Sequence, residues 1–139
     1  MQHCCVNEER CYNIRMNVKR MTPLKKNILK LLKKDHFLSV SQLVEKLHKQ
    51  GQTVNKTSVY RTIESFLNDG IVCQQTFQNE VVYELQEGHH DHLYCTNCGK
   101  VEKTECQMEA SPHTDTKGFQ VDHHHLTLYG KCEDCVIQA

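Results

Sequence analysis

Two Cys-x-x-Cys pairs are the residues of this sequence with the most defined chemistry. The pairs are Cys95 with Cys98 and Cys132 with Cys135. Four thiolates in two chelating pairs match the tetrahedral ligand shell that Zn²⁺ prefers, and iron is the other ion that such a set accepts. The spacing therefore predicts a structural zinc site.

A disulfide framework is the alternative explanation for the same cysteines. The first residues contain no apolar core of a signal peptide, and the nine cysteines are odd in number. No later stretch approaches the ~20 apolar residues of a membrane span. We therefore expect a cytoplasmic protein with no membrane partner, in which the paired cysteines bind metal.

A second group of candidate ligands, His89-His90-Asp91-His92, stands just before the first cysteine pair. Successive side chains of an extended segment point to opposite faces, so His90 and His92 share one face while His89 and Asp91 share the other. Imidazole and carboxylate ligands suit a more exchangeable divalent ion than four thiolates do. This one strand is therefore predicted to serve two further metal sites.

A later run of histidines, His123 to His125, precedes an alternating segment at 126–129. The run could return an imidazole to one of these sites, or it could be a solvated turn. The sequence leaves both interpretations open.

The elements that position these ligands divide by charge. Residues 1–88 carry 13 Lys and Arg against 9 Asp and Glu, whereas residues 89–139 carry 4 Lys and Arg against 8 Asp and Glu. The net charge of zero is therefore the sum of a basic N-terminal part and an acidic C-terminal part. We expect an N-terminal arm at 1–18, a basic domain at 19–86 and an acidic, metal-binding domain at 87–139.

The basic domain has the pattern of three helices and a hairpin. Helix caps are predicted at Thr22, Ser39 and Asn55, each followed by apolar residues at helical spacing. Segments 71–77 and 81–85 are rich in strand formers on either side of a short turn. This order predicts an α+β fold that begins with a winged helix-turn-helix.

The exposed face of the third predicted helix is the candidate DNA-binding surface. A merely solvated face is the alternative, but residues 19–34 hold seven basic and no acidic side chains, as a surface that neutralises phosphates would. We expect double-stranded DNA, and no small organic substrate, to be the ligand. The predicted contact residues are Arg20, Lys56, Thr57, Tyr60 and Arg61.

Six segments of the sequence form one recurring set: Met21–Pro23, Thr57–Ile63, Asp69–Val72, Tyr83–Leu85, His89–Val101 and Leu128–Cys132. Together they resemble the ferric uptake regulator (Fur) family of bacterial metalloregulators. The resemblance implies a homodimeric repressor with an N-terminal winged helix and a small C-terminal α/β dimerisation domain. Such a repressor binds operator DNA when it is loaded with its regulatory metal.

The resemblance also implies three ligand sets. The four paired cysteines would hold structural Zn²⁺. Glu84, His90 and His92 would hold a regulatory Fe²⁺, Zn²⁺ or Mn²⁺ at the hinge between the domains. His89, Asp91 and His124 would belong to a further site inside the dimerisation domain.

The sequence departs from the family pattern at these sites. Phe37 stands where the family usually has a loop histidine, which leaves His36 as a tentative substitute, and Lys103 stands where a glutamate is usual. The family has a longer dimerisation helix where this sequence has the 105–118 segment, which is short and contains Pro112, a residue that disfavours a helix interior. The usual carboxylate of the further site is therefore hard to place, and Glu109 is a tentative candidate. Cys4, Cys5, Cys11, Cys73 and Cys106 are expected to be reduced thiols, and Cys106 could ligate a soft metal.

Two other functions fit parts of the same pattern. A peroxide-sensing repressor of the same family would use iron-catalysed oxidation of its histidines. A metal-dependent hydrolase would use an open position on the metal, but the sequence has no helical His-Glu-x-x-His motif and no evident general base. We therefore expect the chain not to be an enzyme.

Overall fold

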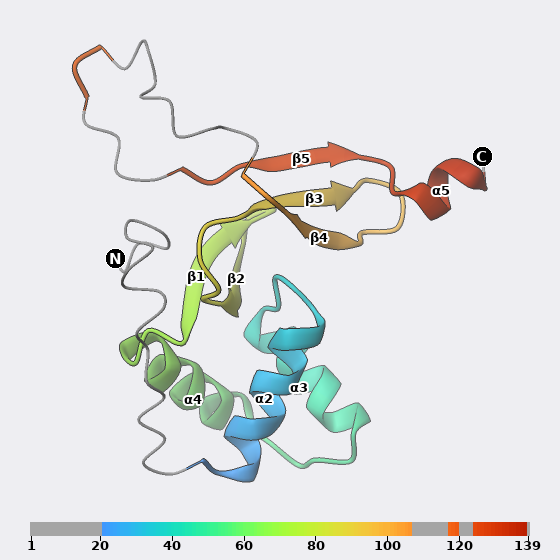
Figure 1. The fold of residues 1–139 in the computed structure, drawn as a ribbon. Helices are drawn as coiled ribbons and strands as arrows, with labels where there is room; N and C mark the ends of the chain where they lie inside the picture. Colours follow the sequence, from blue (N-terminus) through green and yellow to red (C-terminus); the bar gives the residue numbers. More distant parts are fainter. Residues whose placement is uncertain (1–20, 107–116, 120–123, 139) are drawn as a thin grey trace.

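The computed structural model describes residues 21–106, 117–119 and 124–138. Its N-terminal part contains helices α2 (Pro23–Lys34), α3 (Val40–Lys49) and α4 (Lys56–Asn68), followed by strands β1 (Val72–Phe77) and β2 (Glu80–Leu85). Its C-terminal part contains strands β3 (Asp91–Cys95), β4 (Val101–Thr104) and β5 (Thr127–Gly130) and the short helix α5 (Glu133–Ile137). Figure 1 shows α2, α3 and α4 at one end of the molecule and the second sheet, together with α5, at the other. The predicted α+β order is therefore confirmed.

The three predicted helix caps are confirmed by hydrogen bonds. Thr22 Oγ1 accepts from the backbone N–H of Lys25 at 3.2 Å, and Asn55 Oδ1 accepts from that of Ser58 at 2.8 Å. Ser39 forms a reciprocal capping box with Gln42. Each cap satisfies a backbone donor that the first turn of a helix leaves without a partner, and so fixes where the helix begins.

One hydrophobic core holds the three helices and the hairpin together. Its fully buried members include Ile28 of α2, Leu43 of α3, and Val59 and Ile63 of α4. These positions are the apolar stripes that the sequence predicted, and they bury against each other because water solvates them poorly.

The hairpin of β1 and β2 is the wing. Its strands pair antiparallel across a turn at Gln78 and Asn79, both of which adopt positive φ as a two-residue hairpin turn requires. Leu38, in the loop after α2, forms an isolated bridge with Tyr83 of β2. The bridge fastens the wing to the loop that precedes α3.

The second sheet has the strand order β4-β3-β5. The central strand β3 runs antiparallel to β4 and parallel to β5. Residues 86–90 connect the wing directly to β3, so the end of the wing and the start of this sheet are close in space (Figure 1).

Several predictions fall outside the described residues. They are the 1–18 arm, Arg20 and Glu109. The domain boundary at residues 86 and 87 stays a prediction. Among the described helices, none has the length and apolar character needed to cross a membrane.

Candidate metal centres

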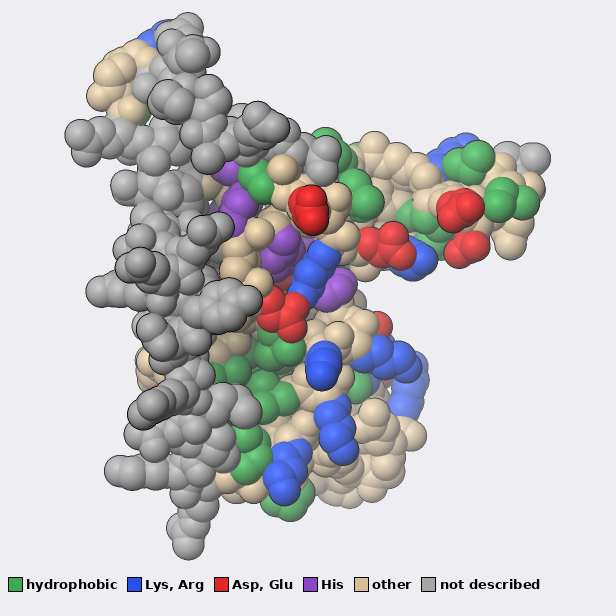
Figure 2. All heavy atoms as spheres, in the orientation of Figure 1, with side chains coloured by type: hydrophobic (Ala, Val, Ile, Leu, Met, Phe, Trp, Pro, Cys, Tyr) green, Lys and Arg blue, Asp and Glu red, His purple; other side chains and the backbone are tan. Residues whose placement is uncertain are grey.

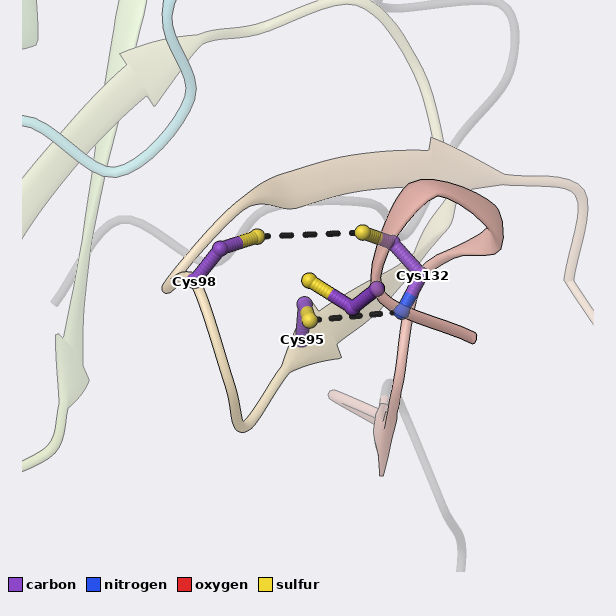
Figure 3. Close-up of side chains that lie close together, drawn as sticks. Cys95, Cys98 and Cys132 are labelled. Carbon is purple, nitrogen blue, oxygen red and sulfur yellow. Dashed lines mark hydrogen bonds between the residues drawn. The ribbon is translucent and has the colours of Figure 1, made fainter. Parts of the chain in front are cut away.

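The four paired cysteines converge on one point. Their sulfur atoms all lie within 4.8 Å of one another, and Cys98 Sγ lies 3.7 Å from Cys132 Sγ (Figure 3). With zinc–sulfur bonds of about 2.3 Å, two sulfurs of a tetrahedral site lie about 3.8 Å apart. The cluster therefore has the ligand type, number and spacing of a closed zinc site.

Backbone geometry shapes this cluster. The first pair sits in a tight turn in which the N–H of Gly99, at φ 76°, donates to Cys95 O at 2.9 Å. Backbone N–H groups of Cys132 and Cys98 lower the pKa of Cys95 to about 6. The backbone N–H of Cys135 lowers the pKa of Cys132, but the neighbouring thiols outweigh it and raise that pKa to about 12. Four thiols this close cannot all ionise without a compensating cation.

The second cluster consists of Glu84, His90 and His92. Glu84 Oε2 lies 3.1 Å from His90 Nε2 and 2.9 Å from His92 Nε2. Burial raises the pKa of Glu84, but the hydrogen bonds from the two imidazoles outweigh it and hold that pKa at about 2. Glu84 is therefore a buried carboxylate anion aimed at two imidazoles, as a divalent ion requires.

Neighbouring groups fix the orientation of these ligands. His90 Nδ1 lies 3.0 Å from the carbonyl oxygen of Gly88, and a proton held on Nδ1 would leave Nε2 to bind an ion placed between it and Glu84. Gln75 Nε2 donates to Glu84 Oε1 at 2.7 Å. Sequence reasoning missed Gln75. The register of the hairpin would have identified it, because position 75 lies diagonally across the strand pair from position 84 and diagonal side chains can contact each other.

A correction concerns Cys73, which lies opposite Glu84 in the register of the wing and has its sulfur 3.8 Å from Glu84 Oε1. We expected a reduced thiol here, but Cys73 is disulfide-bonded. Its burial suits an apolar disulfide sulfur, and cysteine connectivity cannot be deduced from sequence alone.

The departures from the family pattern surround the same cluster. The pKa of His36 is lowered by burial and by the charge of Lys103, which places His36 near the cluster, but no atom of His36 joins the converging ligand set. The Phe37 ring packs against the His92 ring in a tilted arrangement. Lys103 is paired with His92 in the strand register and forms an ion pair with Glu87.

The third cluster contains His89, Asp91, His124 and Cys106. The split between the two faces of the histidine segment, predicted from strand alternation, is thus present in the structure. Of the later histidine run, His124 lies in this cluster, with its Nε2 3.1 Å from His89 Nε2. Sequence reasoning named Cys106 only as a possible soft-metal ligand and proposed Glu109 for the fourth position.

The candidate DNA-binding residues lie together on α4. Lys56, Thr57, Tyr60 and Arg61 are all exposed, and Tyr60 is 50% exposed. Figure 2 shows blue basic side chains over the helical part of the molecule, whereas the purple histidines lie nearer the second sheet. A three-helix domain with a wing, an exposed polar third helix and metal-ligand clusters at the junction defines a metal-responsive DNA-binding regulator.

Comparisons with known proteins agree with this class. A sequence model described as "Ferric uptake regulator family" matches residues 16–129. The "Ferric uptake regulation protein" of Shigella flexneri is 34% identical over 122 residues, which cover 83% of this chain and 82% of the relative. The chain belongs to the ferric uptake regulator family. Members are metal-responsive transcriptional regulators and not enzymes, which excludes the hydrolase alternative.

Solved structures share the fold. A ferric uptake regulator from Francisella tularensis, solved with iron, covers 84% of this chain and 94% of its own at 30% identity, with a TM-score of 0.60. The regulator of Vibrio cholerae covers 84% and 98% at 28% identity, also with a TM-score of 0.60.

Proposed function

We propose that the chain is a homodimeric repressor whose binding to double-stranded operator DNA is switched by a divalent ion held by Glu84, His90 and His92. The observation that carries the proposal is that one buried carboxylate at the end of the wing contacts two imidazoles at the start of the second sheet. Because these groups belong to the two parts of the chain, binding one ion to all of them couples the parts.

The coupling acts through the geometry of the hinge. The wing and α4 move as one body because Val59, Ile63, Val72 and Tyr83 share a core. Holding Glu84 against β3 therefore fixes the direction in which α4 projects from the second sheet. In a dimer, two fixed α4 helices have one spacing, and this spacing selects the separation of the operator half-sites.

The ion acts by shifting a population. It supplies a divalent charge that favours the arrangement in which all three ligands converge. An ion that binds the DNA-competent arrangement 100-fold more tightly than the open one shifts the balance between them by about 2.7 kcal/mol. A shift of this size is enough to switch repression, provided that the free protein populates both arrangements.

The cysteine cluster has a separate role in this proposal. Cys95, Cys98, Cys132 and Cys135 hold a structural Zn²⁺ that joins the turn after β3 to the start of α5. Four thiolates complete the tetrahedral shell and leave no position for a signal. This site stabilises the small second sheet, whose own core is limited.

The regulatory ion is an exchangeable one, drawn from Fe²⁺, Zn²⁺ and Mn²⁺. Imidazole and carboxylate ligands accept all three, and the Francisella tularensis relative was solved with iron. The weak set of three protein ligands suits an ion that is sensed in the cytoplasm rather than held permanently.

DNA contacts in this proposal come from α4 and the segment before α2. Arg61 and Lys56 neutralise phosphates or reach base edges in the major groove, Thr57 and Tyr60 lie beside them, and Arg20 adds a basic contact. The exposure of the four residues on α4 supports their assignment.

Fluorescence anisotropy tests the proposal. Duplexes are selected from a random library with metal-loaded and with metal-stripped protein, where the stripped protein retains its cysteine-bound zinc. We expect at least about tenfold tighter DNA binding with Fe²⁺, Zn²⁺ or Mn²⁺. Glu84→Gln should remove this difference, because a neutral amide offers the ion no charge. Equal affinity of stripped and loaded wild-type protein would overturn the proposal.

A further inference from the structure

We propose that Cys106 completes a third metal site with His89, Asp91 and His124, and that its thiolate makes this site selective for thiophilic Zn²⁺ over Mn²⁺. This inference goes beyond the proposed function, which depends only on Glu84, His90 and His92. It assigns a ligand and a metal preference that follow from this chain's own cysteine.

The topology of the second sheet brings the four ligands to one edge. Strand β3 begins at Asp91, and its parallel neighbour β5 begins just after His124. Strand β4 runs antiparallel and pairs Thr104 with Asp91, so the chain leaves β4 at the same edge and places Cys106 there. Three segments that are distant in sequence therefore meet at the start of β3.

The distances between the ligand atoms are those of a small coordination shell. Nε2 of His124 lies 3.1 Å from Nε2 of His89 and 3.3 Å from Sγ of Cys106. A tetrahedral zinc site places two nitrogens about 3.3 Å apart and a nitrogen and a sulfur about 3.5 Å apart. All four ligand atoms lie within 4.8 Å of one another.

The carboxylate of Asp91 closes the set from the interior. Its side chain is 0% exposed, and its Oδ1 lies 3.6 Å from His124 Nε2 and 3.8 Å from His89 Nε2. The two histidine side chains are 26% and 25% exposed, which leaves a path from solvent. The site therefore has one fully buried ligand, Asp91, and two partly exposed histidines through which an ion can enter from solvent.

The chemistry of the set decides the preference. Two imidazoles and one carboxylate accept many divalent ions, but a thiolate favours Zn²⁺ and Co²⁺ and disfavours the harder Mn²⁺.

Cobalt is the spectroscopic probe for the thiolate. Protein that retains the zinc bound by its two cysteine pairs is titrated with Co²⁺ at neutral pH. Elemental analysis before and after the titration verifies that this zinc stays in place. We expect a sulfur-to-cobalt charge-transfer band in the near ultraviolet whose final intensity corresponds to one thiolate-bound cobalt per chain. Cys106→Ser should lose this band, whereas Gln74→Met, at an exposed position on β1, should keep it.

Zinc and manganese affinities test the selectivity. With a chromophoric chelator as competitor, Cys106→Ser should lower the affinity of this site for Zn²⁺ by at least about tenfold and change that for Mn²⁺ little. Cys106→Asp should remove the cobalt band and raise the Mn²⁺ affinity, because a carboxylate replaces the thiolate. This gain also controls for misfolding, since a misfolded variant would gain no affinity.

The outcomes separate this inference from the proposed function. A wild-type protein without the cobalt band, or a band that persists in Cys106→Ser, would overturn the assignment of Cys106. So would a manganese affinity that falls as far as the zinc affinity in Cys106→Ser. Metal-independent DNA binding together with an intact Cys106-dependent band would overturn the proposed function alone.

Discussion

The ring of Phe37 packs against the imidazole of His92, with centroids 4.2 Å apart and planes inclined by 40°. Phe37 is only 5% exposed and has φ 59°, in the left-handed region that costs a bulky residue of order 1–3 kcal/mol. Its burial, and its contact with Phe77 at 4.8 Å between centroids, offset this cost. An apolar ring thus covers the side of the regulatory cluster from which the family's usual loop histidine would reach the ion.

Phe37→His should add a ligand to the regulatory cluster. Histidine tolerates positive φ better than phenylalanine does, and its ring would replace the one that already lies against His92. We expect the regulatory ion to bind at least about tenfold more tightly and the free energy of unfolding to fall by about 1–2 kcal/mol. Competition titration and thermal unfolding measure the two effects.

Phe77→His is the matched control for that substitution. It introduces the same imidazole into the same aromatic contact, but on the wing and not against His92. Tighter ion binding in both variants, or in neither, would show that the position of Phe37 does not limit the site.

Lys103→Glu should strengthen ion binding at the same cluster. Lys103 is the register partner of His92, and its positive charge, after burial, lowers the pKa of His36 beside the cluster. Reversing this charge should raise the affinity for the regulatory ion by at least about tenfold, even though the ion pair with Glu87 is lost. Isothermal titration of the variant with Mn²⁺ measures the change.

Lys49→Glu controls for the change in net charge, because Lys49 is exposed near the end of α3. It should leave the ion affinity as it is in the wild type. If Lys49→Glu tightened binding as much as Lys103→Glu, the effect would be general electrostatics and not local to the site.

Gln75→Met should weaken the regulatory site without removing a ligand. The Gln75 amide holds Glu84 Oε1 at 2.7 Å, and a methionine of similar length cannot donate this hydrogen bond. Loss of such a partner typically costs roughly 10- to 100-fold in metal affinity. Gln74→Met, an exposed neighbour on β1, should have no effect. Equal affinities of the two variants would assign Gln75 a packing role only.

Cys98→Ser should release the structural zinc. Cys98 is the exposed member of its pair, so the substitution removes a thiolate without opening a buried cavity. We expect less than one zinc per chain in purified protein and a lower melting temperature, because zinc binding contributes directly to the stability of small domains. Elemental analysis and calorimetry test this, and full retention of zinc would contradict the four-thiolate assignment.

Arg61→Ala should weaken DNA binding by about 1–3 kcal/mol if Arg61 contacts a base edge, and should reduce the salt slope by about one unit if it contacts a phosphate. Anisotropy titrations over a range of salt concentrations separate the two. Lys131→Ala, which removes an exposed positive charge from the second part of the chain, should change neither value. An unaffected Arg61→Ala variant would remove α4 from the interface as proposed.

Local rules account for what could be read from the sequence. The caps at Thr22, Ser39 and Asn55 depend on hydrogen bonds to residues three positions away, so the helix starts were predictable. The separation of His90 and His92 from Asp91 follows from the alternation of side chains along a strand. Each Cys-x-x-Cys pair brings two thiols together within a single turn, so the four-cysteine cluster was the easiest candidate site to predict.

Only the tertiary structure decided how distant segments combine into sites. Strand register, and not spacing, brings Cys106 to Asp91, places Gln75 beside Glu84 and opposes Lys103 to His92. Register and sheet order depend on the packing of the whole chain, because a single-residue slip would move every side chain of a strand to its other face. The sequence by itself therefore determined the helices, the wing and most candidate metal ligands, whereas the fold determined which of these candidates lie together and which neighbours restrain them.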